Sequence, residues 1–514
     1  MQRTERGARV AWWLLAAAIA VLAASWRLET LDRRPLWLDE GYTAGVIAKA
    51  PTLAALWRTG SIDEFQHPPF AYLLPWITAR GGETPLRLRL PSVLMGLASI
   101  AGIGALAALL AGRWAGLFAA FLAAISLYHV DFSQQARPYM PGLALTTGQY
   151  LALFAFLLRG KRRWLVGFAL CAVAALYTYH LALLHVGIAA GLALLHVARG
   201  PRARADRGVL GLGFLAVGVA YLPQLGNVAG LLAGQGAAPN HVLALTPRFF
   251  DALVQRWGSG DGVTTHLYEL IFLVGAMRVA ARRDLVSLGI LGWATAPLLV
   301  FASRPFSKYF DIRFLISSLP VFFVLAGVGV DGIGRSAAAL VARVVQRGQW
   351  PRVASIAVVG AAALAFLHPA TKLYQRYRVA ERGCGDFVNE PAIFEANERL
   401  CADHLVLTTI AAEQQWIVRN LHADFAIAPE RLGAYLGTFQ FEDGPPIEIT
   451  RSGDMLIAQV QDLRAYALVP QSETRFLYRT LGTRVLTFEL EPDGRARALV
   501  LESNGVPARA VRVR

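Results

Sequence analysis

The sequence predicts a membrane all-α fold, a polytopic bundle of about eleven helices, followed by a small C-terminal α/β domain. Hydrophobic residues make up 55% of the 514 positions and charged residues only 17%. The mean hydropathy of +0.44 is too high for an ordinary soluble protein. Long apolar runs end near residue 370, and the chain then becomes polar. We therefore predict a membrane domain at 1–370 and a soluble domain at 371–514.

A helix needs roughly 17–25 apolar residues to cross about 30 Å of hydrocarbon, and we predict eleven spans, several of which are short by this measure. The first follows Arg3, Arg6 and Arg9 and also resembles a secretory signal peptide, but the many later spans favour a retained helix. The predicted spans lie near 10–27, 91–111, 114–130, 140–158, 164–178, 181–198, 208–223, 267–281, 285–302, 313–330 and 352–368.

The distribution of Lys and Arg predicts the orientation of these spans. Basic residues gather in links on the side of the N-terminus, such as 159–163, 199–207 and 278–283. Cytoplasmic links carry such an excess. We therefore expect a cytoplasmic N-terminus in a bacterial inner membrane, with a long first outer loop at 28–90 and the C-terminal domain in the periplasm. The net charge of +15 then indicates anionic membrane lipid as a partner, and no nucleic acid.

The C-terminal region has alternating segments at 403–409 and 484–491 that suggest strands. Cys384 and Cys401 lie in it and are able to pair in an oxidising compartment, whereas Cys171 lies in an apolar run and suits packing.

The first outer loop holds an acidic pair, Asp39 and Glu40, beside Trp37 and Leu38. Apolar surroundings and a neighbouring like charge raise the pKa of one member of such a pair, which suits a general base acting on an alcohol. The alternative is that Asp39 caps a helix beginning near Gly41.

The same loop contains a candidate histidine and a candidate pair of arginines. His67 precedes Pro68 and Pro69, whose rigid turn orients the imidazole, and an apolar helix that suits the membrane interface follows. Arg87 and Arg89 stand just before the second span, where guanidinium groups are able to bind lipid phosphate. The alternatives are a structural histidine and arginines that extend along the membrane surface.

Two further polar links lie on the same predicted side. The link at 131–140 contains Arg137 and Tyr139, and the link after the ninth span contains Lys308 and Arg313. Lys308 also suits a simple interfacial anchor. The acidic pair, His67 and these cations thus fall on one face under an orientation assigned from other residues. A carboxylate opposite several cations suits transfer from a phosphate-activated lipid donor to a hydroxyl or amine.

These segments resemble motifs of the GT-C superfamily of integral-membrane glycosyltransferases, which includes protein O-mannosyltransferases and lipid A aminoarabinose transferases. Residues 36–40 resemble the first-loop acidic motif, 67–69 the following Pro-Pro element, 133–139 a Ser-Gln-Glu-Ala-Arg-x-Tyr segment, and 313–320 a later Arg-Tyr-Leu-Leu-Pro-x-Leu-Pro stretch. Gln135, Phe314 and Ser317 depart from the usual residues.

The resemblance implies an inverting transferase that moves a hexosyl or pentosyl group from a polyprenyl-phosphate donor to a lipid, glycan or protein acceptor. It places the catalytic base on Asp39, with Glu40 and His67 in support. Residues expected to bind the donor phosphate are Arg87, Arg137, Tyr139, Lys308 and Arg313. We expect no obligatory cofactor or metal ion. The alternatives are an enzyme that uses a diphosphate-linked oligosaccharide, a polytopic transporter, and an envelope assembly protein without transferase activity.

Overall fold

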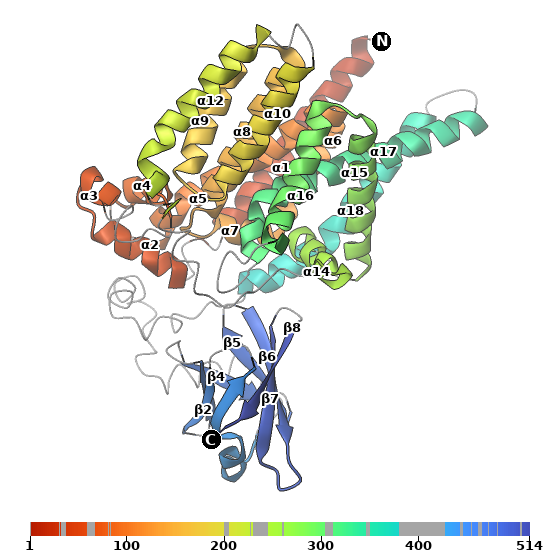
Figure 1. The fold of residues 1–514 in the computed structure, drawn as a ribbon. Coiled ribbons are helices and arrows are strands. Elements are labelled where there is room, and N and C mark those ends of the chain that lie inside the picture. The colour runs from red at the N-terminus through yellow and green to blue at the C-terminus, as the bar shows by residue number, and fades with distance from the viewer. Residues whose placement is uncertain are drawn as a thin grey trace. The chain divides into compact units, whose positions relative to one another are not determined.

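The computed structural model consists of two compact units, Met1–Arg382 and Gly383–Arg514, and each is described by itself (Figure 1). The unit boundary follows the last long helix, α18, which continues past residue 370 to Val379. The structure describes residues 2–29, 31, 38–58, 67–80, 82, 84–199, 205–226, 228–229, 245–259, 262–303, 312–345, 350–379, and 427–513 with gaps at 443–445, 454, 461–464, 471, 481 and 504–505.

The first unit is a bundle of long apolar helices, as the sequence predicted. Within the described residues, eight helices are long and apolar enough to cross a membrane, or nine if one bent pair counts as a span. The long helices are α1 (Gln2–Leu28), α5 (Pro85–Ala111), α8 (Tyr139–Arg159), α12 (Arg207–Tyr221, continued by the 3-10 turn Leu222–Gln224), α15 (Val263–Ala281), α16 (Leu285–Ser303), α17 (Leu319–Val344) and α18 (Trp350–Val379).

The difference from eleven predicted spans arises at three places. One predicted span is the bent pair α6 (Arg113–Ile125) and α7 (Leu127–Ser133). Two others are helices of 14 and 17 residues, α9 (Arg163–Leu176) and α10 (Ala182–Ala198). At 1.5 Å per residue these are about 21 and 25 Å long, shorter than a hydrocarbon core of about 30 Å. The runs predicted at 164–178 and 181–198 were located correctly, and each helix is only one residue shorter than its predicted run.

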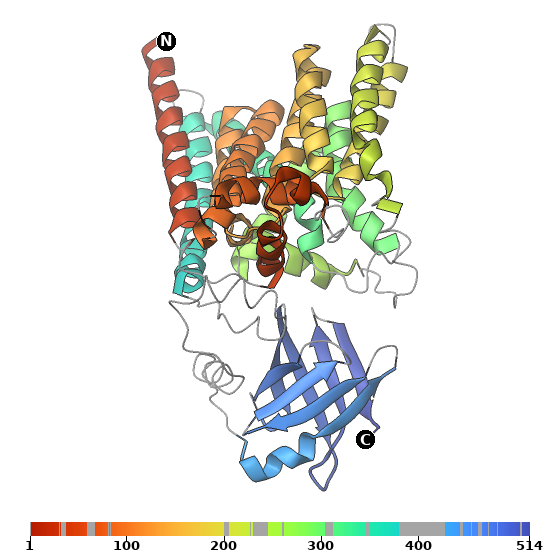
Figure 2. The same cartoon turned by 90° about the vertical axis from the view of Figure 1, so that its left-hand side faces the viewer.

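Short helices gather at the end of the bundle opposite to the N-terminus (Figure 2). They are α2 (Leu38–Ala48), α3 (Leu53–Arg58), α4 (Phe70–Ala79) and α14 (Pro247–Gly258). The α4 helix follows Pro68-Pro69, and its first amide, Phe70 N, donates to Tyr177 O at 2.9 Å. The first outer loop is thereby tied to the turn between α9 and α10.

The bend between α6 and α7 is stabilised by a buried arginine that sequence reasoning did not single out. The two helices meet at 66°, and Ser126 begins α7 by accepting a hydrogen bond from His129 N. Arg27, whose side chain is fully buried, donates to Ala124 O at 3.1 Å and Ala123 O at 3.2 Å. These carbonyls belong to the last turn of α6, where no helical partner exists and the helix dipole is negative. Arg27 therefore supplies hydrogen bonds to the carbonyl groups left open at the bend. This bend redirects the chain toward residues 131–139.

The α15 and α17 helices cross in close contact at two glycines. A Cβ atom added at Gly275 would meet Leu325 O, and one added at Gly329 would meet Ile271 O. Larger side chains would force the helices apart, because backbone lies directly opposite. The crossing fixes the direction of α17, whose N-terminal end continues from the 3-10 turn η3 (Ile312–Ser318) that carries Arg313.

The described part of the second unit is a closed antiparallel barrel, not the predicted α/β domain. Strands pair in sequence order, and β1 closes the barrel on β8. The predicted strand at 484–491 is correct, since β6 buries Leu486 and Phe488 in alternation. The segment 403–409, Cys384 and Cys401 lie outside the described residues. The elements are η6 (Pro429–Tyr435), β1 (Gly437–Phe441), β2 (Ile447–Ser452), β3 (Met455–Val460), β4 (Ala465–Pro470), β5 (Arg475–Thr480), β6 (Gly482–Leu490), β7 (Ala496–Ser503) and β8 (Val506–Arg512).

Candidate active site

The acidic pair lies in the first turn of α2, where negative charge is favourable to the helix dipole. Successive residues of a helix point about 100° apart, so the two carboxylates face different surroundings. The Glu40 side chain is 0% exposed, whereas that of Asp39 is 15% exposed. Asp39 lies one residue inside α2, which begins at Leu38 instead of near Gly41. Only Asp39 is accessible to a substrate.

Glu40 accepts at least three hydrogen bonds from described residues. Arg89 donates to both carboxylate oxygens, from Nε to Oε1 at 2.8 Å and from Nη2 to Oε2 at 2.7 Å. The Ala136 amide donates to Oε1 at 2.7 Å. Glu40 therefore joins α2 to α5 and to the link at 134–138. Glu40 was predicted from the sequence to be one of the catalytic residues. This geometry suits a residue that positions its neighbours better than one that reacts with substrate.

Asp39 has a different guanidinium partner. Arg313 Nη1 donates to Asp39 Oδ2 at 2.8 Å, and the Arg313 side chain is 8% exposed. Within the described part of the chain, Asp39 Oδ1 has no hydrogen-bond partner. Because each carboxylate pairs with its own arginine, Asp39 and Glu40 do not share one site as the spacing suggested. Asp39 keeps one oxygen able to accept a proton.

Arg137 lies beside Asp39 and connects it to His67. Its Nη1 donates to the backbone oxygen of Asp39 at 2.8 Å and to Thr43 Oγ1 at 3.3 Å, and its Nη2 lies 2.7 Å from His67 Nε2. Although burial disfavours the charge, Asp39 holds the pKa of Arg137 above its ordinary value. The remaining donor, Arg137 Nε, is buried and has no partner among the described residues. Such an orphaned donor suits an anionic oxygen of a ligand.

His67 is neutral in this arrangement. An arginine only donates, so His67 Nε2 accepts from Arg137 and the imidazole proton resides on Nδ1. The Nδ1 atom is buried without a partner among the described residues. Burial, and then the charges of Arg137, His180 and Arg313, hold the pKa of His67 well below 6.5. His67 therefore orients Arg137 and is not a cationic phosphate ligand.

A pH titration tests this protonation state. Because the unfolded chain binds the His67 proton near pH 6.5 and the native chain does not, this group destabilises the native state as pH falls below 6.5. The slope is up to about 1.4 kcal/mol per pH unit for one proton. We expect the thermal unfolding midpoint to fall more steeply between pH 7.5 and 5 in the wild type than in His67→Gln. Equal slopes in the two proteins would contradict a neutral, buried His67.

Three other predicted phosphate ligands have different outcomes. Tyr139 is buried at the start of α8, and its ring lies 6.0 Å from the Arg137 guanidinium carbon, so it supports Arg137. Arg87 donates to Gly82 O at 3.4 Å and is not joined to Asp39 by any contact between described residues. Instead Arg89, two residues later, points inward to Glu40. Lys308 lies outside the described residues.

Sequence reasoning missed Thr43 and His180. Thr43 lies one helical turn after Asp39 on α2, so the i, i+4 spacing was a usable signal. His180 is close enough to affect the pKa of His67, but it comes from the turn between α9 and α10, more than a hundred residues away in sequence. No local pattern indicated that proximity.

The described residues contain one group able to hold a metal ion, formed by Asp251, His266 and Glu269. Their ligand atoms lie within 4.8 Å of one another, on α14 and α15. Asp251 and His266 are exposed, and His266 Nδ1 already lies 2.9 Å from Glu269 Oε2. None of the three contacts Asp39, Arg137 or Arg313 through a hydrogen bond or ion pair between described residues. The prediction that no metal ion is obligatory stays a prediction.

Comparison with known proteins bears on the family and the fold of this chain. Residues 66–223 match the family model of dolichyl-phosphate-mannose-protein mannosyltransferase. No curated protein sequence matches the chain. The fold is similar to the oligosaccharyltransferase AglB from Archaeoglobus fulgidus, solved with an inhibitory peptide and a dolichol-phosphate, at 12% identity and a TM-score of 0.53. That similarity covers 76% of this chain but only 59% of the archaeal enzyme's length.

A second solved structure, ArnT from Cupriavidus metallidurans bound to undecaprenyl phosphate, is 17% identical with a TM-score of 0.47, over 84% of this chain and 83% of that one. The matched segment at 66–223 contains His67, Arg89 and Arg137, three of the residues around the acidic pair. The family match and the fold thus confirm the resemblance of this chain to the GT-C superfamily of integral-membrane glycosyltransferases.

Proposed function

We propose that the protein transfers a sugar from a polyprenyl-phosphate donor to a hydroxyl or amine acceptor, with inversion at the anomeric carbon. The observation that supports this most directly is the position of Asp39. Its carboxylate has one oxygen bound by Arg313 and one without a partner among the described residues, and Arg137 lies against its backbone. The cluster thus combines a base with two buried cations.

The acceptor's proton is assigned to Asp39. The acceptor oxygen or nitrogen attacks the anomeric carbon, a new glycosidic bond forms, and the bond from that carbon to the phosphate oxygen breaks with its electron pair on the phosphate. Asp39 removes the proton that the nucleophile loses. The Arg313 contact keeps the carboxylate in one orientation, since a hydrogen bond to Oδ2 leaves Oδ1 directed elsewhere.

The departing phosphate is assigned to Arg137 and Arg313. Charge accumulates on the phosphate as the bond breaks, and buried guanidinium groups stabilise that charge without reorganisation of water. The buried Nε of Arg137 remains able to donate to the phosphate, and the neutral His67 binds Nη2 of the same guanidinium group. Phosphate is already a good leaving group, so no acid is required to protonate it.

The reaction is proposed to take place on the periplasmic face of a bacterial inner membrane. This side follows from the Lys and Arg distribution, and the polyprenyl donor from the resemblance together with the cationic cluster. A transporter without transferase activity is less consistent with the site, because the Asp39 cluster is built from α2, the link before α8 and the 3-10 turn η3 at one end of the bundle, and not from a helix break in mid-membrane.

A purified-component assay tests the proposal. The full chain in detergent is incubated with synthetic polyprenyl-phosphate donors carrying radiolabelled hexose or pentose and with envelope glycolipid acceptors. We expect transfer from a monophosphate donor, and competition by unlabelled monophosphate but not by a diphosphate-linked oligosaccharide. Arg137→Gln should lower kcat/KM by about 10²- to 10³-fold, whereas Arg159→Gln, an exposed arginine ending α8, should not. No turnover with any monophosphate donor or acceptor class would contradict the proposal.

A further inference from the structure

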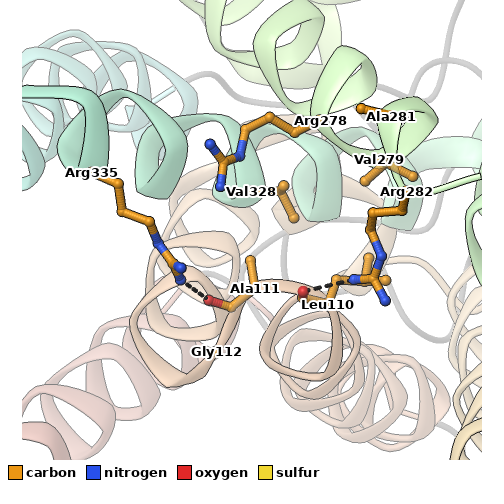
Figure 3. A pocket seen from close by; sticks show the side chains of 9 residues that line it. All are labelled: Leu110, Ala111, Gly112, Arg278, Val279, Ala281, Arg282, Val328 and Arg335. Atoms are coloured by element: carbon orange, nitrogen blue, oxygen red, sulfur yellow. Dashed lines mark hydrogen bonds between the residues drawn. The ribbon is translucent and has the colours of Figure 1, made fainter. Parts of the chain in front are cut away.

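A basic pocket of about 590 Å³ lies between helices of the membrane unit, away from Asp39 (Figure 3). Three arginines line it: Arg278 on α15, Arg282 directly after α15, and Arg335 on α17. The floor is formed by Leu110 and Ala111 at the end of α5 and by apolar side chains. Three guanidinium groups around one cavity in an apolar bundle are the residue types expected of an anion-binding site.

The pocket lies at the opposite end of the bundle from Asp39. The α5 helix begins at the acidic cluster, where Arg89 binds Glu40, and it ends at the pocket with Leu110 and Ala111. From Arg89 to Leu110 the helix advances 21 residues, a rise of about 30 Å, which is close to the hydrocarbon thickness of a bilayer. The two sites therefore face opposite leaflets, and the pocket is level with the headgroups on its side.

Two of the arginines are committed to the end of α5. Arg282 Nη1 donates to Leu110 O and Arg335 Nη2 donates to Ala111 O, each at 2.8 Å. Both also pair with carboxylates, Arg282 with Asp284 at 3.0 Å and Arg335 with Asp331 at 2.7 Å. These contacts hold the two guanidinium groups at the rim but partly neutralise them.

The third arginine, Arg278, is not neutralised in this way. In the part of the chain that the structure describes, it has no carboxylate or hydrogen-bond partner. Its side chain extends from α15 toward α17, as Figure 3 shows, and passes over Gly332, where an added Cβ would meet the Arg278 side chain. The glycine therefore leaves room for an uncompensated cation between Arg335 and Val328.

The surface beside the pocket suits a lipid tail. Leu270, Leu273 and Met277 recur at helical spacing along α15 and are 53%, 56% and 63% exposed. Residues spaced in this way form one stripe along the helix, and the stripe ends one residue before Arg278. An acyl chain on this stripe would bring its phosphate to the level of the three arginines along the helix axis.

We propose that this pocket binds the phosphate of an anionic phospholipid headgroup in the leaflet opposite to the active site. Arg278 supplies the main ionic contact, Arg282 and Arg335 supply further donors, and the apolar stripe of α15 contacts the acyl chain. The site is independent of the sugar-transfer proposal, because none of its residues belongs to the Asp39 cluster.

Native mass spectrometry of the full-length protein in detergent tests the proposal. The protein is titrated separately with dioleoylphosphatidylglycerol, dioleoylphosphatidylcholine and sodium phosphate. We expect phosphatidylglycerol to be retained about tenfold more tightly than phosphatidylcholine, and Arg278→Gln to remove about that factor. Arg278→Lys should retain part of the preference. Arg343→Gln, an exposed arginine farther along α17 and outside the pocket, serves as the matched control and should retain all of it.

The outcomes separate the two sources of phosphate. If the wild type shows no preference for phosphatidylglycerol, or if Arg278→Gln and Arg343→Gln retain it equally, the proposal is wrong. Displacement of the bound lipid by millimolar inorganic phosphate, with phosphate alone stabilising the protein as much as the lipid does, would assign the pocket to free phosphate. That result would overturn the lipid assignment. Should Arg278→Gln express poorly, Gly332→Ala provides a second test, since it displaces the Arg278 side chain and keeps the charge.

Discussion

Asp39→Asn is expected to lower kcat for sugar transfer by about 10²- to 10⁴-fold, the contribution of a positioned general base. The amide has nearly the same shape as the carboxylate, and its oxygen is still able to accept the hydrogen bond from Arg313 Nη1. The loss should therefore appear in kcat while donor KM changes little. The measurement is initial rate against donor concentration in the purified system, with the thermal unfolding midpoint recorded for both proteins.

The matched control is Asp206→Asn, which removes a carboxylate paired with His196 between α10 and α12. It makes the same chemical change in the same membrane unit, outside the Asp39 cluster. Full activity in Asp206→Asn and severe loss in Asp39→Asn would locate the effect at the site. Full kcat in Asp39→Asn would remove Asp39 from the role of base, and loss of kcat together with the unfolding midpoint would show that the variant had misfolded instead.

The positions of the helices could be predicted because apolar runs and basic links are local properties of the sequence. The predicted run near 114–130 covers α6 and most of α7. Its break was not predicted, since it depends on Arg27, which comes from another helix and donates to the last carbonyls of α6. The barrel was also not predicted. Alternation identified a strand at 484–491, but pairing between β1 and β8 is a contact between distant segments that alternation does not encode.

Four of the residues predicted to share one site lie together in the structure, but their individual partners were not predicted. Asp39, His67, Arg137 and Arg313 are brought together by contacts of 2.7 to 2.8 Å, as their shared side of the membrane suggested. The partners within the cluster were not accessible from sequence. Arg87 and Arg89 have the same residue type and nearly the same position, and only the helical rotation of about 100° per residue decides which one points inward.

Glu40→Ala is expected to reduce the free energy of unfolding by about 3 to 5 kcal/mol, because it removes the carboxylate that pairs with the buried charge of Arg89. The amide of Ala136 loses its acceptor as well, so the link that carries Arg137 loses its attachment to α2. The thermal unfolding midpoint should fall sharply, unlike that of Asp39→Asn. Activity should fall in proportion to the folded fraction.

A paired substitution separates these two roles of Glu40. In Glu40→Leu with Arg89→Leu, neither charge is buried, and replacement of a buried ion pair by apolar side chains is often close to neutral for stability. We expect the unfolding midpoint of this double variant to exceed that of Glu40→Ala. If Glu40 only positions α2 and the link at 134–138, the double variant regains stability and some turnover, with the remaining loss caused by the missing Ala136 contact. If Glu40→Ala keeps the wild-type midpoint but loses kcat, Glu40 takes part in the chemistry, and its assignment as a positioning residue is wrong.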